Sequence, residues 1–211
     1  MEGVEQVRAY AMADFNQPHS YFIELFESRF PKFDGKTVLD LGCGPGDISI
    51  RFARAYVDCR IDALDGSAQM LAYGQKIIDQ QKLINRIQFH RCYLPVDVLP
   101  QLQYDAIISN SLLHHLANAV VLWQCIREAS ARGATVFIMD LLRPESVAQA
   151  QSLMNMYAEG EPEILRHDFY HSLLAAYTVE EVTAQLEEAE LPLQVQAVSD
   201  RHLLISGRMP Y

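Results

Sequence analysis

A short apolar segment leads directly into a glycine-rich loop early in the chain. Residues 37–41 read TVLDL, and Gly42, Gly44 and Gly46 follow within five positions. An apolar run bounded by glycine predicts a buried strand. Glycines allow positive φ and let a ligand approach main-chain N–H groups closely. The segment therefore predicts a strand that ends in a ligand-binding loop, which is typical of open parallel sheets.

The rest of the chain continues this alternation of strands and helices. Further strands are predicted at 60–64, 86–90, 105–109 and 133–140, and helices at 46–56, 67–82 and 117–130. Strands that are apolar throughout and are separated by helices indicate a parallel sheet covered on both faces.

The two ends of the chain depart from this alternation. Residues 4–30 read as helical, with an interruption at Asn16-Gln17-Pro18. After residue 144 come predicted helices at 145–158, at 167–177 and from Thr178, which opens a capping box. Two strands at 193–198 and 202–206 predict an antiparallel hairpin at one edge. The expected fold is one α/β domain over 1–211, doubly wound and Rossmann-like, with a mostly parallel seven-stranded sheet.

Composition limits the classes of partner. The chain has 211 residues, 17 basic and 27 acidic, for a formal charge of -10. This charge argues against tight binding to nucleic acid or to an anionic membrane, because Lys and Arg dominate affinity for phosphates. No apolar run reaches the length of a membrane span. The four cysteines are widely spaced, with no Cys-x-x-Cys pair, and predict reduced thiols in a cytoplasmic protein without a signal peptide.

An aspartate after the second strand indicates the kind of ligand. Asp65 ends the segment RIDALD, at a distance from the glycine loop that suits an acid binding ribose hydroxyls. A carboxylate accepts two hydrogen bonds from a vicinal diol, so a nucleoside cofactor is implied. The glycine spacing does not match the G-x-G-x-x-G of dinucleotide folds, which disfavours a nicotinamide-dependent oxidoreductase.

Four segments resemble one enzyme family. DLGCGPG (40–46) is similar to the first motif of class I S-adenosylmethionine-dependent methyltransferases, and ALDGSAQML (63–71) to the second. YDAIISNSLLHHLAN (104–118) resembles the family's fourth-strand motif, and GATVFIMDLLRP (133–144) its fifth strand. The resemblance covers about residues 36–144. It implies a cytoplasmic monomer or homodimer that transfers a methyl group from S-adenosyl-L-methionine to a small molecule.

The resemblance also implies cofactor contacts. Asp65 would bind the ribose, Met70 would lie beside the adenine, and the backbone carbonyl of Asn110 would meet the methionine amino group. The acid that often follows the third strand is missing here, which leaves backbone groups, Cys92 or Tyr93 to bind the adenine edge. The full set of expected cofactor residues is Asp40, Gly42, Gly44, Gly46, Asp65, Gly66, Met70, Cys92, Tyr93 and Asn110.

The acceptor side is less constrained by the sequence. His114 and His115 are candidate catalytic bases because imidazole titrates near neutral pH, although the pair can equally be a feature of a helix start. A metal site is not expected, because adjacent histidines on a turn diverge. The aromatic-rich N-terminal helical segment (1–30) is either a lid over the site or ordinary core packing, and the resemblance implies a substrate lid in the insertion at 145–177. The expected substrate contacts there are Tyr10, Tyr21, Tyr170 and His171.

A second function remains open at this point. A protein that binds S-adenosylmethionine or S-adenosylhomocysteine as a sensor, or as a non-catalytic partner subunit, would carry the same cofactor motifs. Turnover distinguishes the two, because a sensor binds the cofactor without producing S-adenosylhomocysteine.

Overall fold

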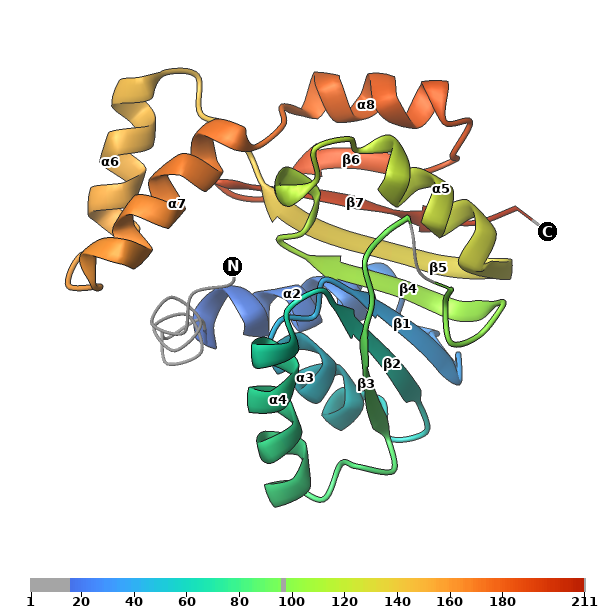
Figure 1. Ribbon diagram of the computed structural model, residues 1–211. Coiled ribbons are helices and arrows are strands. Elements are labelled where there is room, and N and C mark those ends of the chain that lie inside the picture. Colours follow the sequence, from blue (N-terminus) through green and yellow to red (C-terminus); the bar gives the residue numbers. More distant parts are fainter. Residues whose placement is uncertain (1–15, 96–97, 211) are drawn as a thin grey trace.

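One twisted sheet of seven strands organises the computed structural model, which describes residues 16–95 and 98–210 (Figure 1). The strands are Thr37–Leu41 (β1), Arg60–Asp65 (β2), Ile87–Arg91 (β3), Tyr104–Asn110 (β4), Ser130–Leu141 (β5), Gln194–Ala197 (β6) and His202–Arg208 (β7). Their order is β3-β2-β1-β4-β5-β7-β6. The first five are parallel, and β7 pairs antiparallel with both β5 and β6. The predicted fold class, including the hairpin at one edge, is confirmed.

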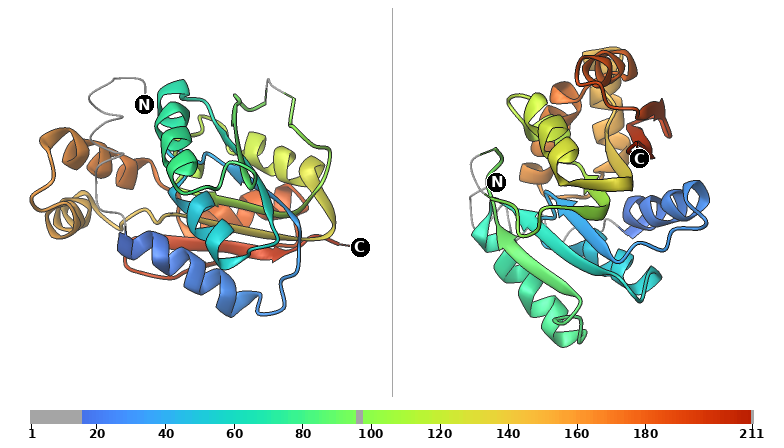
Figure 2. Two further views of the ribbon diagram at one scale, coloured as in Figure 1. Left: turned by 90° about the horizontal axis from the view of Figure 1, so that it is seen from below. Right: turned by 90° about the vertical axis from the view of Figure 1, so that its right-hand side faces the viewer.

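Helices cover both faces of this sheet (Figure 2). They are Asn16–Arg29 (α2), Asp47–Ala55 (α3), Ala68–Gln80 (α4), Val120–Ala129 (α5), Val147–Tyr157 (α6), Glu163–Ala175 (α7) and Val179–Glu188 (α8), with a short 3-10 helix at Leu113–His115 (η1). Alternate side chains of each strand enter different cores: Val38 packs with the α2, α3 and α4 side, whereas Leu39 and Leu41 pack with the α5 and α8 side. Both faces are therefore buried, as the continuous apolar strands predict.

The N-terminal helix α2 is part of the core. Phe22 and Phe26 are fully buried, and the Phe26 ring packs edge-on against Phe52 of α3 and Phe137 of β5. The expected interruption at residues 16–18 is the start of α2. Pro18 lies in the first turn of α2, where a missing N–H leaves no helical bond unmade. Residues 1–15, the other half of the expected N-terminal lid, lie outside the described residues.

Helices α6 and α7 form an arm beyond the end of β5 (Figure 1). The two helices pack on each other through a small apolar cluster that includes Leu153 and Leu173. The arm's two ends meet where the Arg143 N–H donates to the Tyr177 carbonyl at 3.0 Å. The arm is thus an insertion whose entry and exit lie side by side, within the 145–177 segment expected to cover the substrate.

Several element boundaries differ from the sequence expectation, and strand β5 begins at Ser130 rather than at residue 133. Helix α7 begins at Glu163 rather than at residue 167, because Pro162 fixes the preceding backbone and Glu163 suits the first turn. Helix α5 begins at Val120 rather than at residue 117, because η1 occupies part of the connection after β4. The capping box at Thr178 is confirmed, with Glu181 as its partner.

Candidate functional site

A cavity of about 360 Å³ lies at the carboxyl ends of the central strands. This volume is within the range of small-molecule sites, and the position is where open α/β sheets bind ligands. The wall is built from the ends of β1, β2 and β4, the start of α4, the loop after β3, and η1. Its lining includes Gly42, Gly44, Asp65, Gly66, Ser67, Met70, Cys92, Tyr93, Leu94, Asn110, Ser111, Leu112, His115 and Leu116.

The glycine loop is held open toward this cavity. The N–H groups of Gly42 and Cys43 both donate to the Leu64 carbonyl, at 2.8 and 2.9 Å, which fixes the loop against β2. Gly44 has a φ of +55°, and a Cβ placed on it would meet no atom within 4 Å. Gly46 differs, because a Cβ there would come within 2.6 Å of the Phe89 ring. Packing therefore requires glycine at position 46. At position 44 the positive φ favours glycine, and the volume that a side chain would fill is part of the cavity.

Asp65 connects the two loops that carry the cofactor motifs. Its Oδ2 accepts a hydrogen bond from the Gly44 N–H at 2.9 Å, and its Oδ1 accepts one from the Ser67 N–H at 2.7 Å. A carboxylate has about four acceptor positions, so roughly two remain for hydroxyl groups in the cavity. Asp65 is thus equipped both to hold the glycine loop and to bind a ribose diol.

The opposite wall suits a flat base. Met70 is buried on α4, and Cys92 is buried after β3. The exposed Tyr93 ring packs against Gly66, where an added Cβ would lie 2.7 Å from the ring. Arg91 fixes this arrangement by donating to the Tyr93 hydroxyl at 3.0 Å and to the Gly66 carbonyl at 3.2 Å. A sulfur-lined and aromatic wall of this kind offers apolar contact to an adenine ring.

Asn110 supplies an unusual acceptor. Its Oδ1 is buried and has no hydrogen-bond partner among the described residues, and the side chain lines the cavity. A buried acceptor without a donor is costly unless a ligand supplies one. The primary ammonium and the sulfonium charge of S-adenosylmethionine fit a site that presents this oxygen and the Asp65 carboxylate. The described residues therefore fit the cofactor that the sequence motifs imply.

Asp40 is not among the residues that line the cavity. It is 1 % exposed, and its Oδ2 accepts a 2.5 Å hydrogen bond from Ser49 in the first turn of α3. Burial raises the pKa of Asp40 to about 7, although the Ser49 hydrogen bond partly opposes this rise. Asp40 thus supports the glycine loop and α3 from within the core, and the structure does not bring it to the cofactor cavity.

We expect Asp40 to make stability fall as the pH rises. Its pKa is about 7 in the folded protein and 3.8 when unperturbed, so the folded state binds more protons between these values. The free energy of unfolding should therefore lose a few kcal/mol from about pH 4 to pH 7 relative to Asp40→Asn, which has no such proton. Urea unfolding of both proteins at pH 5 and pH 8 measures this difference. An identical pH dependence in the two proteins would contradict the assignment.

The two adjacent histidines point to different environments. His114 is buried, and its Nδ1 lies 2.6 Å from the Asp140 carboxylate at the end of β5. His115 lines the cavity and is exposed on its outer side. Burial of its inner side and, second, the charge of His114 lower the pKa of His115 to about 4. Of the two candidate bases, the structure brings only His115 to the cavity, because His114 is turned toward Asp140.

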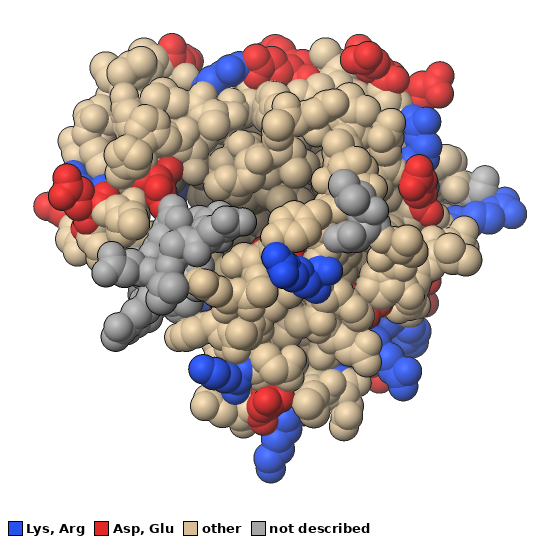
Figure 3. All heavy atoms as spheres, in the orientation of Figure 1, with Lys and Arg blue, Asp and Glu red and all other residues tan. Residues whose placement is uncertain are grey.

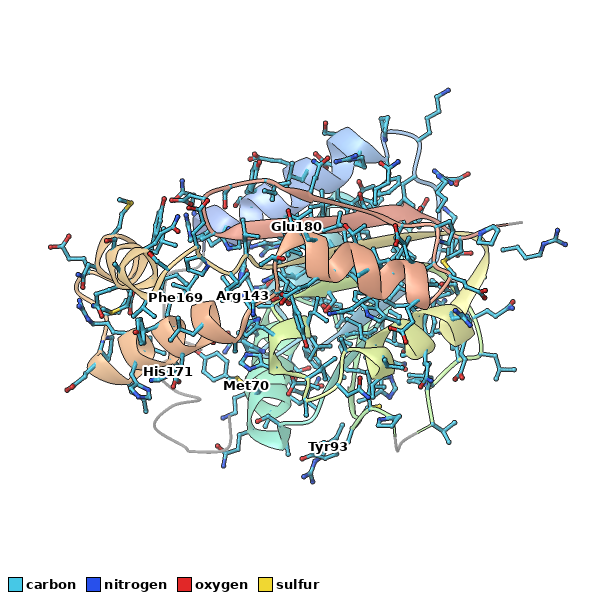
Figure 4. The ribbon with its side chains drawn as sticks, turned by 90° about the horizontal axis from the view of Figure 1, so that it is seen from above. Met70, Tyr93, Arg143, Phe169, His171 and Glu180 are labelled. Carbon is cyan, nitrogen blue, oxygen red and sulfur yellow. The ribbon has the colours of Figure 1, made fainter. Side chains whose placement is uncertain are left out.

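Three of the four expected substrate-binding residues lie in the described part of the chain. The Tyr21 hydroxyl donates to the Val198 carbonyl at 3.3 Å, and Tyr21 packs beside the core on the α2 side, away from the cavity lining. Tyr170 packs in the arm's own cluster, and His171 is exposed with its ring 4.3 Å from that of His167. Figure 4 shows His171 and Phe169 on the arm, with Met70 and Tyr93 across from them. Tyr10 lies outside the described residues.

Several residues that line the cavity were not predicted from the sequence. Ser67 was expected as a helix cap and does accept from the Met70 N–H, but it also lines the cavity. Leu94, Leu112 and Leu116 also line the cavity and make part of its wall apolar. Leu112 also fills the space beside Gly42, where a Cβ would lie 2.8 Å from its side chain. Leucines next to a motif carry no signal that separates wall from core, so only the folded structure identifies them.

No group of three or more potential metal ligands occurs in the part of the chain that the structure describes. Within the same residues, no helix is long and apolar enough to span a bilayer.

Comparison with known proteins agrees with this geometry. Residues 38–133 match the model of a methyltransferase domain family. The plantazolicin methyltransferase BpumL, solved with S-adenosylhomocysteine, superimposes with a TM-score of 0.74 at 12% identity, covering 98% of this chain and 90% of that one. The matched residues make up just under half of the chain, and together with the motifs and the strand order these similarities support a class I S-adenosylmethionine-dependent methyltransferase.

The curated relatives are more similar in sequence, but each matches only part of this chain, and their names give different acceptors. (S)-Coclaurine N-methyltransferase of Thalictrum flavum subsp. glaucum is 28% identical over 116 residues, which is 55% of this chain and 32% of the relative. Ribosomal RNA small subunit methyltransferase C of Shewanella denitrificans is 34% identical over 93 residues, or 43% of this chain and 25% of the relative. The matches span a third or less of these relatives' own length. These relatives therefore do not identify the acceptor of this chain.

Proposed function

We propose that this protein transfers a methyl group from S-adenosyl-L-methionine to a small-molecule acceptor. The observation that carries the proposal is the cavity that brings together the Gly44 loop, the Asp65 carboxylate and the unpartnered Asn110 oxygen. These groups are complementary to a nucleoside diol at one end and an ammonium at the other. The cofactor supplies an electrophilic methyl group on a sulfonium, so the protein's main task is to orient the acceptor in line with it.

The acceptor end of the cavity favours an uncharged, largely apolar small molecule. Among the described lining residues, Asp65 is the only Asp, Glu, Lys or Arg side chain. Leu94, Leu112 and Leu116 give the same lining apolar side chains. In Figure 3 the charged side chains lie mostly toward the outline of the molecule, and no broad basic surface faces the viewer. The net charge of -10 disfavours an RNA acceptor, because Lys and Arg dominate affinity for phosphates.

The arm is the proposed cover of the acceptor. Helix α7 lies against η1, which carries His115 at the cavity wall. A cover over this rim would exclude water and strengthen electrostatic contacts during transfer. Aromatic side chains on α7 such as Phe169 and Tyr170 can supply apolar contact near the acceptor. The expected substrate roles of Tyr170 and His171 belong to this proposal.

We place the protein in the cytoplasm. All four cysteines are buried thiols, and Cys92 and Cys125 lie in one apolar cluster. Free thiols are typical of a reducing compartment.

Turnover tests the proposed function. The purified protein is incubated with methyl-labelled S-adenosylmethionine and a metabolite extract, and both S-adenosylhomocysteine and the labelled product are quantified by mass spectrometry. We expect a labelled small molecule and an equal amount of S-adenosylhomocysteine. Cofactor binding measured by calorimetry without any product would instead indicate the sensor or partner-subunit function. Label in RNA rather than in small molecules would contradict the proposed acceptor class.

A further inference from the structure

The arm is fastened to the sheet at a second place besides its root. Tyr157, the last residue of α6, donates its hydroxyl hydrogen to Asp200 Oδ2 at 2.7 Å. The guanidinium carbon of Arg201 lies 3.3 Å from the centroid of the Tyr157 ring, and Arg201 Nη1 donates to Asp200 Oδ1 at 3.1 Å. Asp200 and Arg201 lie in the turn between β6 and β7. We call these three residues the latch.

Arg201 holds both the entry to the arm and the far end of its first helix. Its backbone carbonyl accepts from the Leu142 N–H at 2.9 Å, where the chain leaves β5 toward α6. Its side chain stacks on Tyr157, where α6 ends. A guanidinium over an aromatic face is attracted by the ring quadrupole, more strongly where water is excluded. The Arg201 side chain is 15 % exposed, so this contact is well shielded.

The contact at the end of α6 also acts on α7. Arg166 of α7 donates to Asn155 Oδ1 at 3.0 Å and to the Ala158 carbonyl at 3.4 Å, on either side of Tyr157 in the sequence. The small apolar cluster of the arm joins the same two helices. Helix α7 in turn lies against η1, part of which lines the cavity. A displacement of the end of α6 therefore moves α7 over the cavity rim.

The root of the arm fixes one end of it. The Arg143 N–H donates to the Tyr177 carbonyl, and the Arg143 side chain forms an ion pair with Glu181 of α8. Two helices that are held at one end can tilt about that end as a rigid body. A second attachment at the end of α6 opposes this tilt, and the latch provides it.

We propose that Arg201 is a positioning residue for the acceptor: its stacking on Tyr157 holds the arm in the pose that covers the acceptor end of the cavity. This inference rests on the proposed methyltransferase function. Arg201 does not line the cavity and acts only through the arm. Because Tyr157 remains 41 % exposed, the latch can open and close without disturbing either main core.

A distance measurement tests the latch without any acceptor. Spin labels are attached to Gln151→Cys on α6 and to Gln80→Cys on α4, which are both exposed positions, in protein saturated with S-adenosylhomocysteine. Labelling of the wild-type protein checks that the four buried native cysteines do not react. We expect a narrow distance distribution that Arg201→Ala broadens toward other arm positions. Alanine keeps the carbonyl that accepts from Leu142, so only the side-chain contact is lost. An unchanged distribution would overturn the proposal.

Variants of the partner ring test whether stacking is the cause. Tyr157→Ala should broaden the distribution as Arg201→Ala does, and the double variant should be no broader, because both substitutions remove one shared contact. Arg201→Lys keeps a cation without the flat guanidinium and should give an intermediate result. Additive broadening in the double variant would overturn the stacking role.

Arg208→Ala is the matched control. Arg208 lies on the same strand β7 and also faces an aromatic ring, with its guanidinium carbon 5.7 Å from the Phe30 centroid, but it does not contact the arm through this pair. The control should leave the distance distribution as in the wild type. Equal broadening in Arg208→Ala and Arg201→Ala would overturn the specific role of the latch.

Kinetics with the acceptor found in the labelling screen test the effect on the reaction. Arg201→Ala should raise the acceptor KM by about 5- to 30-fold, the range by which loss of a shielded cation–π contact shifts a two-state equilibrium. The kcat and the affinity for S-adenosylmethionine should stay within about twofold, because a bound acceptor restores the closed arm. An unchanged acceptor KM with a lower kcat or melting temperature would indicate a merely structural role and overturn the proposal. A failed screen would contradict the proposed function instead, and the distance measurements would still be readable.

Discussion

Replacing Gly44 with valine is expected to abolish S-adenosylmethionine binding and to leave a folded protein. Gly44 adopts a φ of +55°, in which a β-branched side chain is strained, and the space around its missing Cβ opens into the cavity. The valine methyl groups would occupy volume that the cofactor needs. They would also shift the N–H that donates to Asp65. Isothermal calorimetry should show a loss of affinity of at least about 100-fold, with a near-native circular dichroism spectrum.

Gly160→Val is the matched control for this experiment. Gly160 also has a positive φ, +83°, and also has no atom within 4 Å of an added Cβ, but it lies between α6 and α7, outside the cavity lining. The two substitutions share backbone strain of about 1–3 kcal/mol, and only the one at position 44 obstructs the cavity. Full affinity in the Gly44 variant, or equal loss in both, would mean that the loop does not contact the cofactor.

Asp65→Ala is expected to weaken S-adenosylmethionine binding by about two to four orders of magnitude. Two hydrogen bonds from ribose hydroxyls to a carboxylate contribute roughly 1.5–3 kcal/mol each. The same substitution also releases the Gly44 and Ser67 N–H groups, so the glycine loop loses part of its preorganisation. Asp65→Asn keeps one acceptor oxygen and should fall between wild type and alanine. Calorimetry on the three proteins gives the order.

A second carboxylate provides the control for loss of backbone support. Asp105 accepts from the Lys36 and Thr37 N–H groups at 2.7 and 2.9 Å, at the amino end of β1 and far from the cavity lining. Asp105→Ala should lower the melting temperature and leave cofactor affinity within about twofold. Unchanged affinity in Asp65→Ala would remove this residue from the cofactor site.

Local sequence pattern was sufficient to predict much of the fold. Strand β1 was predicted with its observed ends, and β2 and β4 to within one residue at each end, because buried parallel strands are short apolar runs bounded by turn residues. Helix starts at Ser67 and Thr178 were predicted because capping is a contact between near neighbours in sequence. The start of α7 was missed, because its arm packs mainly on itself and has a weak apolar pattern.

The sequence motifs also predicted several residues that line the cavity. Gly44, Asp65, Met70, Tyr93 and Asn110 all line one cavity, as their positions after consecutive strands imply. Parallel strands place their carboxyl ends at one edge, so residues distant in sequence converge there once the strand order is known.

Only the tertiary structure distinguishes the two adjacent histidines. His114 and His115 are equivalent in sequence, and the difference between them arises because Asp140, brought alongside by the pairing of β4 with β5, binds one and not the other. The connection between them and β4 turns at Ser111, which has a positive φ of 60° and is held by its N–H on the Met139 carbonyl. Periodicity in a sequence specifies which residues are buried, whereas the direction of a side chain at a turn depends on contacts from other elements. The sequence thus determined the fold class and the cofactor, and only the packing of β5 against η1 determined which histidine lines the cavity.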